Sequence, residues 1–255
     1  MLIITGKEHD LGGGMVVRRL LPYAKKRMVG PFTFLDHMGP VEIKPGQNTD
    51  VRPHPHIGLS TLTYLFEGRI VHRDSLGKVA TIQPGEVNWM TAGKGIAHSE
   101  RAHEDDRNKT RKLHGLQIWL ALPDGQEEID PSFQHYGLDQ LITKQTQDYT
   151  LNLVAGEGFG LKSPVKVTSP LILADFIMKN DAEITADLKH FEIAVYVVDG
   201  SLEINNQTLT NSQMAVLDDG QTLKLKAKNK TRFIILGGEA FKTPRYIWWN
   251  LVSSS

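Results

Sequence analysis

The chain has 255 residues, a length that allows one large domain or two moderate domains, each with its own core. Lys and Arg together number 29, as do Asp and Glu, so no net charge draws the protein to nucleic acid or to an anionic membrane. Cysteine is absent, which excludes disulfides, thiolate metal ligands and a cysteine nucleophile.

The N-terminal residues Met1–Lys7 lack the basic start and the apolar core of a signal peptide. No apolar run approaches the roughly 18 residues of a membrane-spanning helix. We therefore expect a soluble, cytoplasmic protein that binds neither a membrane nor nucleic acid directly.

The first forty residues consist of short apolar pieces separated by turns. Residues Met15–Pro22 follow three glycines, and residues Phe32–Pro40 follow Gly30 and Pro31. Strands of about five residues separated by Gly, Pro, Asn or Asp are typical of an all-β sandwich or barrel. His37 lies among apolar residues, and we expect a buried, hydrogen-bonded histidine there rather than a metal ligand.

The segment Val51–Pro123 continues this pattern of strands and holds two pairs of candidate metal ligands. His54 and His56 are two residues apart, and so are His98 and Glu100. Because side chains two apart on a strand share a face, each pair is predicted to project to one side. Pro55 cannot donate to a ladder, so it indicates an edge strand or the start of a strand.

Two such pairs facing each other would offer one cation three imidazole nitrogens and one carboxylate oxygen. Imidazole suits Fe, Ni, Cu and Zn, and a carboxylate extends the choice toward Mn. A His-x-His motif alone is equally compatible with two surface or core histidines. The arrival of His98 and Glu100, beginning 42 residues after His56, favours a metal site.

Between Gln126 and Thr150 the chain becomes rich in acidic residues, Gln and Ser, as expected of an exposed connector. We place the domain boundary in this segment. The prediction is an N-terminal metal-binding domain at residues 1–130 and a C-terminal domain at residues 131–255.

The second half of the chain shows signs of repeating the first. The segment Tyr64–Gly68 is echoed by Tyr196–Gly200, 132 residues later, which indicates an internal duplication. At that offset His54 and His56 correspond to Ala186 and Leu188, which cannot bind a metal, and His190 falls outside the ligand register. We expect the second domain to be a structural barrel whose centre is filled by side chains.

A family resemblance is carried by motifs spaced along nearly the whole chain. In chain order these are Gly30–Pro40, Arg52–His56, Tyr64–Gly68, Trp89–Gly93, Gly95–Glu100, Leu116–Trp119, Leu122–Pro123 and Gly237–Glu239. With them the sequence resembles the pirin family of the cupin superfamily. One departure is Ser60, where relatives often carry a glutamate near the site.

The resemblance implies an all-β protein of two tandem cupin barrels, each a double-stranded β-helix or jelly roll, with one metal in the N-terminal barrel. It implies His54, His56, His98 and Glu100 as the ligands, the same four that the spacing proposes. The expected ion is Fe(II), and Ni, Mn, Co, Cu and Zn remain alternatives.

The resemblance also implies quercetinase activity, the O₂-dependent cleavage of a flavonol ring. On this hypothesis the substrate oxygen binds the metal, and Glu100 acts as both ligand and base. An alternative from another class is a metal-dependent interaction protein that binds a transcription factor or a metabolic enzyme. A third alternative, a sugar-phosphate isomerase, requires basic residues in the pocket, and the sequence places none there.

Overall fold

The structure is a computed structural model that describes residues 1–12, 15–188, 191–218 and 220–255. The chain forms two compact units. The first barrel consists of Lys7–Pro22, Thr33–Leu138 and Lys242–Ser255, and the second barrel consists of Met1–Gly6, Tyr23–Phe32 and Asp139–Phe241. The division expected from the sequence, at residues 130 and 131, is continuous, whereas each unit also takes in segments from elsewhere in the chain.

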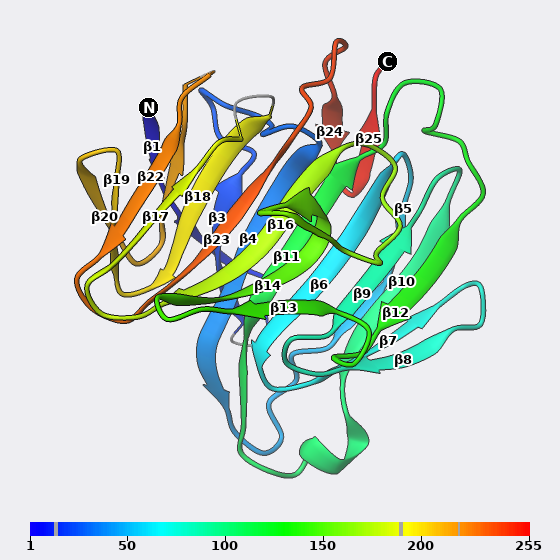
Figure 1. Ribbon diagram of the computed structural model, residues 1–255. Helices are drawn as coiled ribbons and strands as arrows, with labels where there is room; N and C mark the ends of the chain where they lie inside the picture. Colours follow the sequence, from blue (N-terminus) through cyan, green and yellow to red (C-terminus); the bar gives the residue numbers. More distant parts are fainter. Residues whose placement is uncertain (13–14, 189–190, 219) are drawn as a thin grey trace. The chain divides into compact units, whose positions relative to one another are not determined.

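The first barrel has a seven-stranded sheet in the order β12-β9-β6-β11-β4-β3-β2, a four-stranded sheet in the order β5-β10-β7-β8, and the hairpin β24-β25 (Figure 1). The strands of the larger sheet are β2 (Lys7–Asp10), β3 (Val16–Leu21), β4 (Phe32–Ile43), β6 (Leu59–Glu67), β9 (Val87–Thr91), β11 (Arg111–Ala121) and β12 (Ser132–Tyr136). The others are β5 (Val51–His56), β7 (Ile70–Asp74), β8 (Val79–Ile82), β10 (Ile96–Ala102), β24 (Tyr246–Trp248) and β25 (Leu251–Ser253).

The second barrel has one large sheet in the order β1-β21-β18-β23-β16-β14-β13, with β15 paired to β14, and a four-stranded sheet in the order β17-β22-β19-β20. The strands of the large sheet are β1 (Leu2–Thr5), β13 (Ile142–Gln145), β14 (Tyr149–Gly158), β15 (Leu161–Lys162), β16 (Leu171–Met178), β18 (Glu192–Asp199), β21 (Gln213–Val216) and β23 (Thr231–Gly238). Those of the small sheet are β17 (Ala182–Ala186), β19 (Ser201–Ile204), β20 (Gln207–Thr210) and β22 (Leu223–Ala227).

These elements confirm the predicted class of two all-β cupin barrels. In the described part of the chain the only helical element is the short 3₁₀ turn η1 (Glu104–Asp106). None of the described residues forms a helix long and apolar enough to cross a bilayer.

Burial explains why the strands differ in their hydrophobic patterns. Strand β6 is central in its sheet, and its first seven residues are all buried, so apolar and β-branched residues run on without alternation. Strand β22 alternates buried and exposed residues because only one face of its sheet meets the core. The buried faces of β17 and β22 join the apolar core of the second barrel.

The expectation for His37 is confirmed. Its side chain is buried, and its Nε2 lies 2.7 Å from Nε2 of His114. Burial, followed by the charges of His114 and Arg18, lowers the pKa of His37 to about 3. His37 is therefore a neutral core residue at physiological pH.

Candidate metal centre

Strand pairing in the small sheet of the first barrel brings the predicted ligand pairs together. Strand β10 pairs antiparallel with β5, so that His98 lies opposite His54 and Ile96 lies opposite His56. Directly opposed residues point to the same face with their Cβ atoms about 5 Å apart. Strand β5, which carries Pro53 and Pro55, is an edge strand, as Pro55 led us to expect.

Three imidazoles converge at this place. One ligand nitrogen from each of His54, His56 and His98 lies within 4.8 Å of the others. The Nε2 atoms of His56 and His98 are 3.1 Å apart. Glu100 is not a member of this three-residue cluster, although it lines the same cavity.

Hydrogen bonds to backbone carbonyls orient two of the rings. His54 Nδ1 donates to the carbonyl of Arg52 at 2.8 Å, and His56 Nδ1 donates to the carbonyl of Asn250 at 2.9 Å. A carbonyl oxygen only accepts, so each Nδ1 carries a proton, and in the neutral ring each Nε2 keeps its lone pair. A neutral ring with an available Nε2 lone pair is the form of histidine that binds a metal.

The third ring is oriented by a chain of side chains that sequence reasoning missed. Asp74 accepts from His72 Nε2 at 3.0 Å, which leaves His72 Nδ1 as the acceptor for His98 Nδ1 at 3.3 Å. Nε2 of His98 is thereby also left with a free lone pair. Asp74 is fixed in turn by the backbone N–H groups of Leu76 and Lys78.

The spacing of His72 and Asp74 is the sequence feature that could have predicted this series of hydrogen bonds. They lie two residues apart on β7, which pairs with β10 so that Asp74 is opposite His98 and His72 is opposite Glu100. Partners of this kind on ligating histidines fix the ring orientation and raise ligand basicity.

The electrostatics of the cluster keep two of its imidazoles, His56 and His98, neutral. Burial, followed by the charges of His98 and His54, lowers the pKa of His56 to about 3. Burial, followed by the charges of His54 and His72, lowers the pKa of His98 to about 2. Since a metal binds the neutral ring, no proton has to leave either residue at neutral pH.

Glu100 responds in the opposite direction. Burial raises the pKa of its carboxyl group, and the neighbouring His54 and His72 act against that rise. A cation next to the carboxylate would favour the ionised form. Glu100 is thus a group whose charge depends on what occupies the cluster.

The three histidines and Glu100 line a cavity of about 570 Å³, a volume suited to a small organic ligand. The Phe34 and Trp119 rings are stacked with centroids 4.1 Å apart, and Trp119 meets His56 edge-on at 5.1 Å. Much of the remaining wall is apolar, with contributions from Leu11, Met15, Val17, Met38, Ile43, Ile70 and Leu113. The cavity therefore offers a flat aromatic surface beside the histidine cluster.

Basic residues line this cavity too, so the expectation that none could be placed in the pocket is wrong. They are Arg19, Arg52, Arg69, Arg101, Arg111 and Lys112. Because they come from different strands and turns of the barrel, no sequence spacing reveals that they converge. Three are already paired with carboxylates: Arg19 with Asp36 at 2.8 Å, Arg69 with Asp106 at 2.6 Å and Lys112 with Glu67 at 3.5 Å.

The donor set fits a divalent transition metal. Three imidazoles bring one ring nitrogen each into one space, each ring is held by a partner on its other nitrogen, and a carboxyl group lies in the same cavity. Imidazole and carboxylate are the ligands that Fe, Ni, Cu and Zn sites use.

Comparison with known proteins identifies the family. The pirin family model matches residues 14–120, and the model of the pirin C-terminal cupin domain matches residues 173–255. A pirin-like protein of Caulobacter vibrioides is 48% identical over 257 residues, covering 100% of this chain and 88% of that protein. The chain belongs to the pirin family.

Other pirin relatives and a solved structure extend this likeness over the chain. Pirin of Rattus norvegicus is 30% identical over 251 residues, covering 95% of this chain and 83% of its own length. The crystal structure of quercetin 2,3-dioxygenase from Acinetobacter baumannii is 38% identical, with a TM-score of 0.92 over 100% of this chain and 84% of that one. The histidine cluster lies within the region matched by the pirin model.

Proposed function

We propose that the protein is a metal-dependent dioxygenase of the quercetin 2,3-dioxygenase type, which cleaves a flavonol-like ring with O₂. The observation that carries this proposal is the convergence of three imidazoles and Glu100 on a cavity with an aromatic wall. The name of the similar Acinetobacter baumannii structure supports the same substrate class.

In this proposal Nε2 of His54, His56 and His98 holds one divalent metal, and Glu100 is the fourth ligand. We propose Fe(II) as the ion, with Ni, Mn, Co, Cu or Zn as alternatives. When bound, the metal supplies Lewis acidity and electron transfer with O₂, which is chemistry that side chains lack.

The chain itself positions the substrate and moves a proton. The stacked Phe34 and Trp119 rings hold the flat ring system of the substrate beside the cluster. A carboxylate oxygen of Glu100 accepts the proton of the substrate's phenol or enol hydroxyl. Burial raises the pKa of Glu100 in the metal-free protein, whereas a bound cation would act against that rise and keep the carboxylate ionised, the form that accepts a proton.

The cationic wall suits the deprotonated substrate. Arg52, Arg101 and Arg111 line the cavity, and no ion pair to a carboxylate is present for them among the described residues. A negative charge on the substrate would be stabilised by these guanidinium groups.

The proposal is tested by metal analysis of the isolated protein joined to an oxygen-uptake assay with quercetin. Uptake should rise in proportion to metal content. Glu100→Gln should retain metal and lose turnover, whereas Glu157→Gln, an exposed change in the second barrel, should leave both unchanged. Full activity of Glu100→Gln would remove the proposed base.

A filled site without oxygen uptake would favour the alternative of a metal-dependent interaction protein. The basic residues favour one further candidate, an isomerase that acts on a sugar phosphate. Turnover of a sugar phosphate without oxygen consumption would support that candidate, but the stacked aromatic wall argues for a flat substrate.

A further inference from the structure

The hairpin near the C-terminus takes part in the site of the first barrel. Strands β24 and β25 are joined by a two-residue turn, Trp249 and Asn250, and both turn residues line the cavity. The carbonyl of Asn250 is the acceptor that orients His56, although 194 residues separate the two in sequence. One ring of the histidine cluster thus depends on a backbone atom of this hairpin.

The hairpin also contacts the backbone directly after His56. The N–H of Val252 donates to the carbonyl of Ile57 at 3.1 Å, and Leu251 pairs with Ile57. Gly58 has φ +69°, and a Cβ atom there would lie 1.9 Å from the carbonyl oxygen of Val252. Only glycine permits so close an approach.

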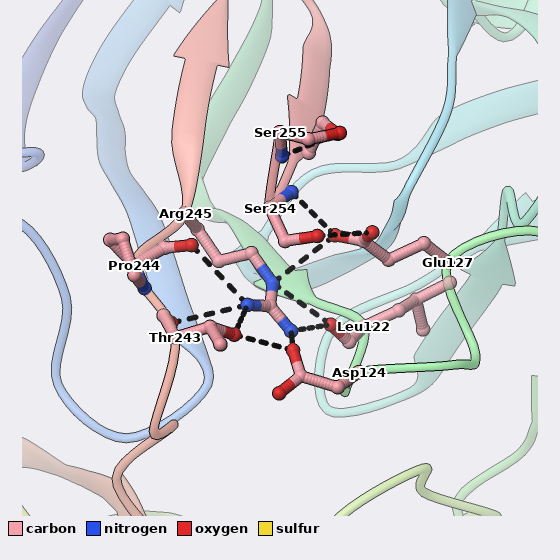
Figure 2. Close-up of polar contacts among 9 residues, drawn as sticks. Leu122, Asp124, Glu127, Thr243, Pro244, Arg245, Ser254 and Ser255 are labelled. Atoms are coloured by element: carbon pink, nitrogen blue, oxygen red, sulfur yellow. Dashed lines mark hydrogen bonds and ion pairs between the residues drawn. The ribbon is translucent and has the colours of Figure 1, made fainter.

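A buried guanidinium fixes the start of the hairpin (Figure 2). The Arg245 side chain is fully buried, and its Nη2 donates to the carbonyl of Leu122 at 2.9 Å and to Asp124 at 2.6 Å. Its Nε lies 3.3 Å from Glu127 Oε1. Bonds from one guanidinium to several acceptors are directional, so they set the orientation of the strand as well as its position.

Glu127 fixes the end of the hairpin as well. Its two carboxylate oxygens accept from the N–H and the hydroxyl of Ser254, each at 2.8 Å (Figure 2). A two-stranded hairpin is at best marginally stable on its own. Arg245 and Glu127 supply the contacts that hold this one in place on both sides.

We propose that the C-terminal hairpin is a positioning element of the metal centre, held by Arg245 and Glu127, which orients the His56 ring and closes the cavity with Trp249. This inference rests on the metal site proposed above. Loosening the hairpin frees the acceptor of His56 Nδ1, so the ring no longer presents Nε2 in a fixed direction.

Trp249 supplies the second part of this role. Its backbone has φ 50°, a left-handed conformation that is costly for an aromatic residue. The side chain remains 62% exposed while lining the cavity. The turn therefore holds an indole ring at the mouth of the cavity, where a flat ligand can stack on it.

The first experiment measures Co(II) binding to the full-length protein by competition and by visible absorption. Arg245→Met and Glu127→Gln should each weaken Co(II) binding about tenfold and change the absorption bands, as expected when an outer partner of a ligand is lost. Arg232→Met is the matched control, because Arg232 pairs with buried Asp175 in the second barrel. It should lower the melting temperature and leave Co(II) affinity and spectrum unchanged.

Unchanged Co(II) affinity and spectrum in the folded hairpin variants would overturn the proposal. If Arg245→Met does not fold, Glu127→Gln, which keeps the side chain's size, decides. Absence of Co(II) binding by the wild-type protein would overturn this inference together with the metal site. Absence of oxygen uptake by a metal-loaded wild-type protein would overturn only the dioxygenase function.

The second experiment separates the two parts of the role with Trp249→Gly. Glycine accepts the left-handed conformation, so the hairpin and Co(II) affinity should be retained. Binding of quercetin, followed by fluorescence quenching, should weaken roughly three- to tenfold from the loss of one aromatic contact. Unchanged quercetin binding would overturn the role of Trp249, and lost Co(II) binding would overturn the separation of the two parts.

Discussion

The two barrels have matching strand orders, but different kinds of side chain line their centres. The order β9-β6-β11-β4 in the first large sheet is matched by β21-β18-β23-β16 in the second, and β5-β10-β7-β8 is matched by β17-β22-β19-β20. The echoed segments end β6 and β18, which occupy corresponding places. The duplication inferred from the sequence is therefore a duplication of topology.

The corresponding inner faces differ in chemistry. Strands β5 and β10 place His54, His56 and His98 around one point, whereas β17 and β22 place Ala186 and Leu225 in an apolar cluster. Burying apolar surface stabilises a barrel by about 25 cal/mol per Å², but buried imidazoles need partners. The same scaffold thus surrounds an apolar centre in one barrel and the proposed metal site in the other.

The largest effect is expected when one of the proposed metal-binding histidines of the first barrel is replaced. His98→Ala should weaken metal binding by more than the roughly 100-fold typical of an outer-shell change, and should abolish turnover. Metal content after dialysis and oxygen uptake measure the two effects. His135→Ala removes an exposed histidine of the same barrel and should change neither; retention of metal by His98→Ala would contradict the assignment.

The second largest effect is expected from acid, which should lower the free energy of unfolding through histidines of the first barrel. The pKa of His37, His56 and His98 is lowered to about 3 or below, so below pH 6.5 the unfolded chain binds protons that the folded metal-free protein does not. Their stabilising effect is full above pH 6.5 and falls as the pH drops, by up to about 1.4 kcal/mol per pH unit for each histidine.

Urea unfolding of the metal-free protein between pH 4.5 and 7.5 measures this loss. His98→Gln should reduce the slope by about one third, since it removes one of three titrating groups. The only histidine in the second barrel's sequence, His190, lies outside the described residues, so we attribute the expected slope to the first barrel. A stability that is flat across this range would refute the prediction.

A cavity in the apolar centre should cost stability without affecting the metal. Leu225 is fully buried, and Leu225→Ala should lower the free energy of unfolding by about 2–5 kcal/mol. Lys224→Ala, an exposed change on the same strand, is the control and should cost little. Chemical denaturation gives the stability, and metal affinity of the folded variant should stay at the wild-type value; a fall in affinity would show that the centres are coupled.

The smallest effect on metal affinity is expected from a change in the hydrogen-bonded series Asp74–His72–His98. Asp74→Asn can donate to His72, which reverses its tautomer and leaves two N–H groups facing each other at His98. Metal affinity should weaken about tenfold, or about 1.4 kcal/mol. Asp130→Asn, at an exposed pair with Lys94, should have no effect on competitive metal binding, and equal affinities for the two variants would exclude the proposed chain.

Sequence reasoning reached the features that depend on local spacing. His54 and His56 share a strand, and the turn before His98 returns the chain beside them, so two-residue spacing was enough to propose the cluster. Glu100 has the same spacing from His98, but a bulge in the pairing with β5 falls between them, and Glu100 lies opposite Val51. A bulge shifts register, and nothing in the local spacing announces it.

Features that depend on distant pairing were beyond the sequence. The acceptor for His56 comes from Asn250, and the cavity's basic residues come from several strands. Strand β1, at the N-terminus, belongs to the second barrel, and residues 242–255 belong to the first barrel. No local sequence pattern indicates either assignment. Each depends on which strand pairs with which, and hydrophobic patterns leave that choice open.

The link between Asn250 and His56 has a consequence for biosynthesis. A chain leaving the ribosome would expose His54, His56 and His98, the proposed ligands, long before residues 242–255 emerge, so the backbone acceptor of His56 would arrive only after the rest of the first barrel. A fragment that ends near residue 130 would carry every proposed ligand yet lack the carbonyl of Asn250 that orients the His56 ring.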